Sequence, residues 1–121
     1  MSFVNFSNHS SKYWSKNQIE AARAWGEIVD IPFPNVEADC TEEEIRYIAE
    51  STIQEIMKYQ PQAVLCQGEF TLSYAVIRCL RQMGIMVCAA CSKRIAEEIC
   101  LEDGISKKES QFEFVRFRKY E

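Results

Sequence analysis

Apolar residues in this chain fall into two patterns, short unbroken runs and longer stripes that repeat every three or four residues. The runs predict buried strands, and the stripes predict helices with one apolar face. Strands are expected over residues 3–6, 27–31, 63–66 and 85–90, with a helix after each of the first three. This alternation predicts right-handed crossovers and a largely parallel α/β sheet with helices on both faces.

The three predicted helices carry signals at their ends. Ser15 is followed by Gln18, and Thr41 by Glu44, at the spacing of a capping box. The third helix is followed by Gly84, which suits a C-terminal cap. Each helix therefore has at least one end that the sequence predicts.

The pattern changes after residue 92. Residues 94–101 and 111–117 are predicted as two more strands, joined by residues 102–106, where Asp103-Gly104 marks a turn. We therefore expect a C-terminal antiparallel β-hairpin in addition to the parallel sheet.

Composition narrows the classes of protein. Hydrophobic residues make up 47% and charged residues 26%, which is ordinary for a globular chain, and 121 residues fit one domain spanning residues 1–121. No apolar segment reaches the length of a membrane span and the N-terminus lacks a secretory pattern, so a cytoplasmic protein that does not enter a membrane is expected. The net charge of −4 argues against binding to long nucleic acid, whereas local cations can still bind a small anion.

The chain has six cysteines, which a cytoplasmic compartment would keep reduced. Cys66, Cys79 and Cys88 lie on apolar faces, where a thiol behaves as a small hydrophobe. Cys88 and Cys91 also form a lone C-x-x-C, which lacks the second ligand pair of a zinc site. Buried thiols are the first interpretation, and a thiol redox or interaction protein is the alternative.

The strand at residues 63–66 turns into a helix at Gly68. Such a turn leaves free backbone N–H groups, which together with the positive end of the helix dipole favour a phosphate or another anion. A strand-to-helix turn that binds nothing is the alternative, since a single glycine is a weak signal.

Ligands of open α/β sheets bind at the carboxyl ends of the parallel strands. Three predicted loops should meet there, namely residues 7–12, 67–71 and 91–94. They offer hydroxyls, backbone amides, the Gln67 amide and the Arg94 cation, a set suited to phosphate and ribose. Metal-ligand spacing, a Walker lysine and a repeated dinucleotide glycine pattern are missing, so no cofactor is expected.

Two residues of these loops could move a proton. His9 is the single histidine, the residue type most often used to move a proton near neutral pH, although it could also be a loop residue that makes one hydrogen bond. Glu69 could act as a base or could simply complement the helix dipole.

Four segments together give the chain a family resemblance. They are Asn5-Phe6-Ser7-Asn8-His9, Gln67-Gly68-Glu69-Phe70-Thr71, Ser92-Lys93-Arg94 and the tail Phe114-Val115-Arg116-Phe117-Arg118-Lys119-Tyr120. With these segments the chain resembles small CRISPR-associated ring nucleases. The resemblance implies a Rossmann-like domain, related to the sensor domains of type III CRISPR effectors, that dimerises and binds cyclic oligoadenylate, usually cyclic tetra-adenylate, across its two-fold axis.

The resemblance also implies an activity. Relatives linearise this second messenger without a metal, the ribose 2′-hydroxyl attacking the adjacent phosphate to leave a 2′,3′-cyclic phosphate, which switches antiviral signalling off. Some relatives bind the messenger without cutting it, so sequestration is the alternative function.

The implied site residues fall into two groups. The catalytic candidates are His9, Ser10 and Arg94, and the ligand-binding candidates are Asn8, Ser11, Gln67, Gly68, Glu69, Phe70, Thr71, Ser92, Lys93 and Arg116.

Overall fold

The computed structural model describes the backbone of residues 1–100 and 106–121, and the side chains of residues 1–95 and 112–121. Its elements follow the chain as β1 (Ser2–Ser7), a 3-10 turn η1 (Ser11–Tyr13), α1 (Lys16–Arg23), β2 (Glu27–Pro32), α2 (Glu42–Met57), β3 (Pro61–Gln67), α3 (Phe70–Gln82), β4 (Met86–Cys100) and β5 (Ser106–Lys119). The predicted Asp103-Gly104 turn lies outside the described residues. No helix of the described part is long and apolar enough to cross a membrane.

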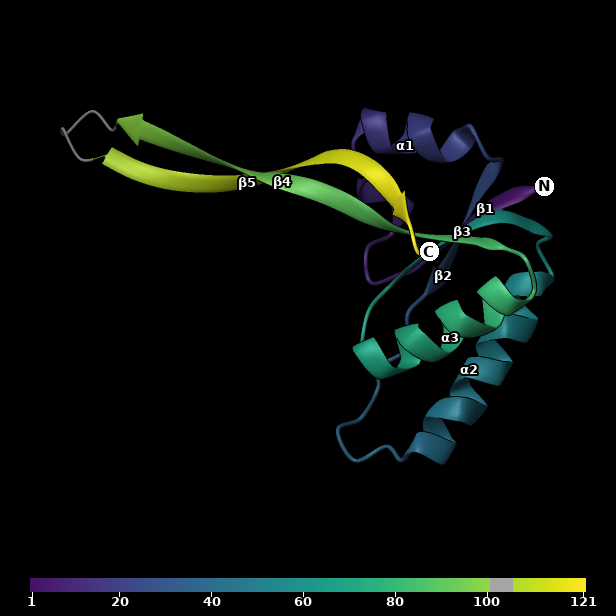
Figure 1. Cartoon of the computed structure of the whole chain (residues 1–121). Helices are drawn as coiled ribbons and strands as arrows, with labels where there is room; N and C mark the ends of the chain where they lie inside the picture. Colours follow the sequence, from purple (N-terminus) through teal and green to yellow (C-terminus); the bar gives the residue numbers. More distant parts are fainter. Residues whose placement is uncertain (101–105) are drawn as a thin grey trace.

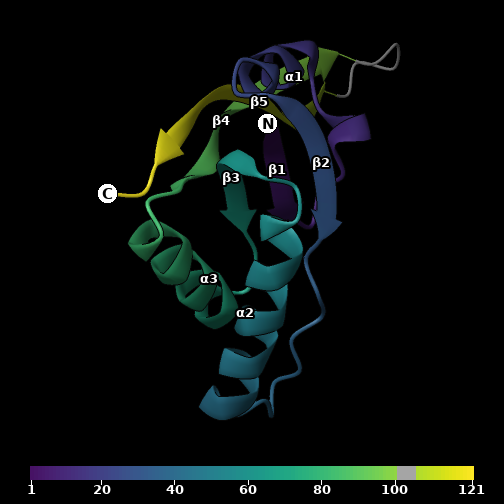
Figure 2. The same ribbon diagram turned by 90° about the vertical axis from the view of Figure 1, so that its right-hand side faces the viewer.

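The strands form one five-stranded sheet in the order β2-β1-β3-β4-β5. β1, β2, β3 and the first part of β4 run parallel, and β5 runs antiparallel to β4. Helix α1 covers one face of the sheet, whereas α2 and α3 cover the other (Figures 1 and 2). The predicted Rossmann-like α/β fold with a mainly parallel sheet and a C-terminal hairpin is confirmed.

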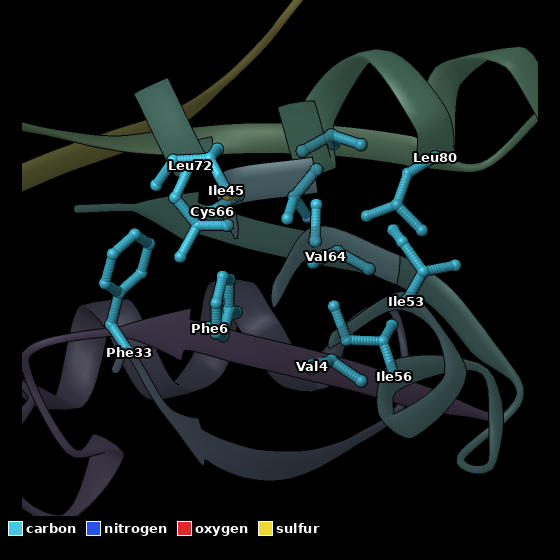
Figure 3. Packing of buried hydrophobic residues seen from close by; sticks show 13 residues of the cluster. Val4, Phe6, Phe33, Ile45, Ile53, Ile56, Val64, Cys66, Leu72 and Leu80 are labelled. Carbon is cyan, nitrogen blue, oxygen red and sulfur yellow. The ribbon is translucent and has the colours of Figure 1, made fainter. Parts of the chain in front are cut away.

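Alternating residues of β1 supply the two cores. Val4 and Phe6 face α2 and α3 in the larger core, which also holds Ile56, Val64 and Leu80 (Figure 3). On the α1 face, Phe3 packs with Leu65, Ala22 and Cys88. All six residues of β1 are buried, as expected for a central strand covered on both sides.

Strand β4 continues past the parallel sheet. Its first residues pair with β3, and it then pairs with β5 from Cys88↔Lys119 to Cys100↔Ser106. The resulting two-stranded ribbon extends away from the helices, beyond the edge at which α3 begins (Figure 1).

The expected loop at residues 91–94 is therefore wrong. These residues lie within β4, where a shift in pairing register between Cys91 and Ser92 marks an irregularity but no break. Neither glycine nor proline occurs between Gly84 and Gly104, so the sequence offers no residue that would end the strand there.

Candidate functional site

The loop that follows β1 is fixed by a cross-strand pair of polar residues. Asn5 of β1 lies opposite Asp30 of β2, and its Nδ2 donates to Asp30 Oδ1 at 2.8 Å. The same amide group donates to the His9 carbonyl oxygen at 2.8 Å, and Asn5 Oδ1 accepts from Ser7 Oγ at 2.7 Å. Because Asn5 is 1% exposed, this loop is anchored by a buried amide with all its hydrogen-bonding atoms engaged.

Asp30 organises the outer half of the loop. Its Oδ1 accepts from the Ser11 backbone N–H at 3.1 Å, and its Oδ2 accepts from Ser11 Oγ at 2.8 Å and Ser10 Oγ at 3.5 Å. Partial burial raises the pKa of Asp30, but the hydrogen bonds from Asn5, Ser11 and Ser10 outweigh burial and leave the pKa below its usual value. Asp30 is therefore an ionised acceptor at neutral pH, and sequence reasoning did not single it out.

A hollow of about 260 Å³ lies beside this loop. Its lining is Asn5, Ser7, Asn8, Ser10, Asp30, Ile31, Pro32 and Phe33. Thus Asn8 and Ser10, both predicted from the sequence, lie around one hollow at the carboxyl ends of β1 and β2. His9 lies in the same loop with its side chain exposed.

The N-terminus of α3 is capped by the protein itself. The Glu69 carboxylate accepts from the Thr71 N–H at 2.9 Å and from the Leu72 N–H at 2.8 Å. These bonds, the Leu72 N–H foremost, lower the pKa of Glu69. The expectation of free amides at this turn is wrong for these two groups, and Glu69 complements the helix end, as its alternative interpretation predicted.

Gly68 makes room for an aromatic ring. A Cβ atom at this position would lie 2.5 Å from two atoms of the Phe33 ring. The ring itself stacks on Phe6 with centroids 4.6 Å apart, at one end of the larger core (Figure 3). The close approach that the sequence predicted for a ligand is thus made by Phe33.

Gln67 and Thr71 also serve the fold. Gln67 exchanges two side-chain hydrogen bonds with the backbone of Ala90, donating to its oxygen at 3.3 Å and accepting from its nitrogen at 3.0 Å. The Gln67 amide thereby joins β3 to β4 two residues beyond their last register pair. The Thr71 hydroxyl donates to Glu69, and Thr71 lines a separate groove of about 760 Å³ between α2 and α3.

The remaining predicted residues lie on the ribbon or at the start of α3. Ser92, Lys93 and Arg94 are exposed on β4, opposite Phe114, Glu113 and Phe112 of β5, and Arg116 pairs with Cys91. Arg116 Nε donates to the Phe117 carbonyl oxygen at 3.2 Å. Phe70, the first residue of α3, is 88% exposed.

One thiol of the C-x-x-C segment, that of Cys88, is buried, and so is the Cys66 thiol. Burial raises the pKa of Cys88 to about 12, and the same cause raises that of Cys66 to about 12. A thiol that stays protonated at neutral pH is a poor nucleophile, which disfavours the redox alternative.

One family model covers almost the whole of this fold. The model of the uncharacterized protein MJ1673 family matches residues 1–118, which include both cores, the β1 loop and the ribbon. The chain belongs to this family. No curated protein matches the chain.

Proposed function

We propose that this protein binds cyclic tetra-adenylate at the carboxyl edge of its sheet and linearises it without a metal ion, ending type III CRISPR signalling. The ligand comes from the family resemblance of the sequence. The observation that supports it most is the β1 loop, whose hydroxyls and amides surround a hollow at the carboxyl ends of β1 and β2. The chain order reverses between β1 and β3, and ligands of open α/β sheets bind beside such a point, so the β1 loop borders it while the hollow lies on the β2 side of that loop.

The chemistry needs positioning and charge stabilisation more than strong acid or base. The ribose 2′-oxygen forms a bond to the adjacent phosphorus while the bond from phosphorus to the 5′-oxygen breaks. The 2′-hydroxyl loses its proton and the 5′-oxygen gains one, so the product carries a 2′,3′-cyclic phosphate and a 5′-hydroxyl. His9 is the proposed proton carrier, with Ser10 beside the phosphate and Arg94 on the developing charge.

The size of the hollow favours a complex in which two copies of the protein bind one cyclic tetra-adenylate. At about 260 Å³ it lies below the usual range of roughly 300–1,000 Å³ for a whole small-molecule site. This hollow would therefore hold one nucleotide unit, and a two-fold symmetric dimer would present two such hollows to two of the four units of the ring.

Cleavage is tested with cyclic tri-, tetra- and hexa-adenylate incubated with the protein in excess EDTA. Liquid chromatography with mass detection is expected to show linear products with a 2′,3′-cyclic phosphate from the tetra-adenylate. The His9→Ala variant is expected to slow cleavage more than it weakens binding. If cyclic tetra-adenylate stays intact with an equimolar amount of protein, the proposed nuclease activity is rejected, and binding without cleavage is the remaining function.

Sequestration without cleavage is the second candidate. The Glu69 carboxylate occupies two amides that would otherwise stabilise a charged phosphate oxygen at the start of α3. Tight binding of a ring that chromatography recovers unchanged would select this function.

Phe70 is expected to stack on an adenine base. An aromatic side chain that is 88% exposed at the carboxyl edge contributes little to the core, and base stacking is worth about 1–3 kcal/mol per base. Phe70→Ala should therefore weaken binding of cyclic tetra-adenylate by about tenfold with an unchanged melting temperature. Calorimetry measures the affinity.

Tyr47→Ala is the matched control for Phe70, because Tyr47 is 72% exposed on α2. The Tyr47→Ala variant should bind cyclic tetra-adenylate with the same affinity as the unmodified protein. Equal losses in the two variants would mean that Phe70 has no specific place in binding.

A further inference from the structure

The hollow beside the β1 loop has the lining of a sugar subsite. Its polar residues are a carboxylate, two hydroxyls and two amides, from Asp30, Ser7, Ser10, Asn5 and Asn8. Within the described part of the chain, no lysine or arginine lines it. A carboxylate repels phosphate and accepts hydrogen bonds from hydroxyls, so this lining suits the sugar of a nucleotide better than its phosphate.

The position of the carboxylate in the sheet points the same way. Asp30 lies near the end of β2, directly opposite Asn5 of β1. In dinucleotide-binding α/β folds, an acidic residue that follows the first helix of the fold binds ribose hydroxyls. Pro32 and Phe33 also line the hollow and provide apolar surface against which the C–H groups of a sugar ring can pack.

We infer that Asp30 accepts a hydrogen bond from the 2′-hydroxyl of a ribose held in this hollow, so that the protein discriminates ribonucleotides from deoxyribonucleotides. The identity of the whole ligand rests on the proposed function. The ribose subsite itself rests on the hollow and on Asp30.

The two oxygens of Asp30 have different tasks. Oδ1 accepts from Asn5 Nδ2 and from the Ser11 N–H, which hold the carboxylate in place. Among the described residues, Oδ2 accepts hydrogen bonds only from the hydroxyls of Ser11 and Ser10. Hydroxyls turn about their C–O bonds, so a ribose hydroxyl can replace them at Oδ2 with a bond of the same type.

Substitution of Asp30 by asparagine separates recognition from simple charge. Asparagine keeps an acceptor oxygen for Asn5 and the Ser11 N–H but loses the charged acceptor at the second position. Asp30→Asn should weaken binding of cyclic tetra-adenylate about tenfold and leave binding of the all-2′-deoxy ring nearly unchanged. If charge alone mattered, Asp30→Asn would have the opposite effect on affinity. Both rings are anions, so removal of a negative charge from the protein would strengthen binding of both.

Glu27→Gln is the matched control, because it removes the same charge from the opposite end of β2. Glu27→Gln should prefer cyclic tetra-adenylate over the all-2′-deoxy ring by the same factor as the unmodified protein. If Asp30→Asn does not fold, as judged by circular dichroism, the comparison of the two rings in the unmodified protein decides instead. Equal affinity for both rings, or tighter binding of both by Asp30→Asn, would overturn the ribose subsite and leave ring binding standing.

A second probe distinguishes failure of the subsite from failure of the proposed function. AMP and 2′-deoxy-AMP are titrated while the backbone amide resonances of Ser10 and Ser11 are followed. Larger shifts with AMP in a protein that binds neither ring would support the ribose subsite and remove cyclic tetra-adenylate as its ligand. If neither ring nor AMP binds, both proposals fall.

Discussion

Replacement of Gly68 with valine is expected to lower the free energy of unfolding by about 1–3 kcal/mol. The new Cβ would lie 2.5 Å from the Phe33 ring, which cannot move away freely because it stacks on Phe6 at 4.6 Å. The backbone of Gly68 does not have a positive φ, so the expected loss comes from the clash and not from a strained backbone. Urea unfolding followed by tryptophan fluorescence measures it.

A double-mutant cycle with Phe33→Ala isolates this clash. Phe33→Ala alone should cost about 3–5 kcal/mol, because it removes a buried ring. In that background, Gly68→Val should cost little or should partly restore stability, because its methyl groups enter the vacated space. If Gly68→Val leaves stability unchanged and lowers only ligand affinity, Gly68 contacts the ligand, as the sequence alone suggested.

Elements whose signals lie in a few adjacent residues could be predicted from the sequence. Thr41 and Glu44 form both bonds of the predicted capping box at the start of α2, and Ser15 accepts from the Gln18 N–H at the start of α1. Each of the four apolar runs became a strand of the sheet, although the residues of the edge strand β2 are half-buried or exposed and none is buried. The continuous β4 could not be predicted in this way, because its apolar run ends at Cys91 while its backbone pairing with β5 continues to Cys100.

The position of the β1 loop was predictable, but the expected meeting of three loops was not found: among the described residues, none of 67–71 or 91–94 lines the hollow. The β1 loop does lie at a carboxyl edge, as the parallel sheet required. Asp30 was missed because its partner Asn5 lies 25 positions away and only the pairing of β1 with β2 brings them together. The one signal available was an acidic residue inside the apolar segment Ile28–Ile31. The approach of Phe33 to Gly68 was not foreseen either, because these residues lie 35 positions apart and only the fold brings them together.

The Asn5→Asp variant is expected to lose about 3–4 kcal/mol of stability at pH 7. Asn5 is 1% exposed, and its amide donates to Asp30 and to the His9 carbonyl oxygen. A carboxylate there would face a second carboxylate and a carbonyl oxygen in a buried position. Burial and the like charge of Asp30 should both raise the pKa of the new carboxyl group.

The pH dependence of this loss identifies its cause. A carboxyl group whose pKa is raised by folding costs nothing while it is protonated in both states, so the loss should be small near pH 4 and should grow towards pH 7. The native Asp30 acts in the opposite sense: its lowered pKa gives stability that is present above the unfolded value and fades as the pH falls through the folded one. Urea unfolding of the unmodified protein and of Asn5→Asp gives the difference in their free energies of unfolding at pH 4 and at pH 7.

Asn8→Asp is the matched control, because it adds the same charge to the same loop at an exposed position. A solvated carboxylate keeps nearly its ordinary pKa, so this variant should lose little stability at either pH. A loss in Asn5→Asp that is the same at pH 4 and pH 7 would indicate lost packing or a lost donor instead of a buried charge. A loss confined to neutral pH would establish that the uncharged amide of Asn5 is what allows Asp30 to remain ionised beside the β1 loop, and so to act as an acceptor for a sugar hydroxyl.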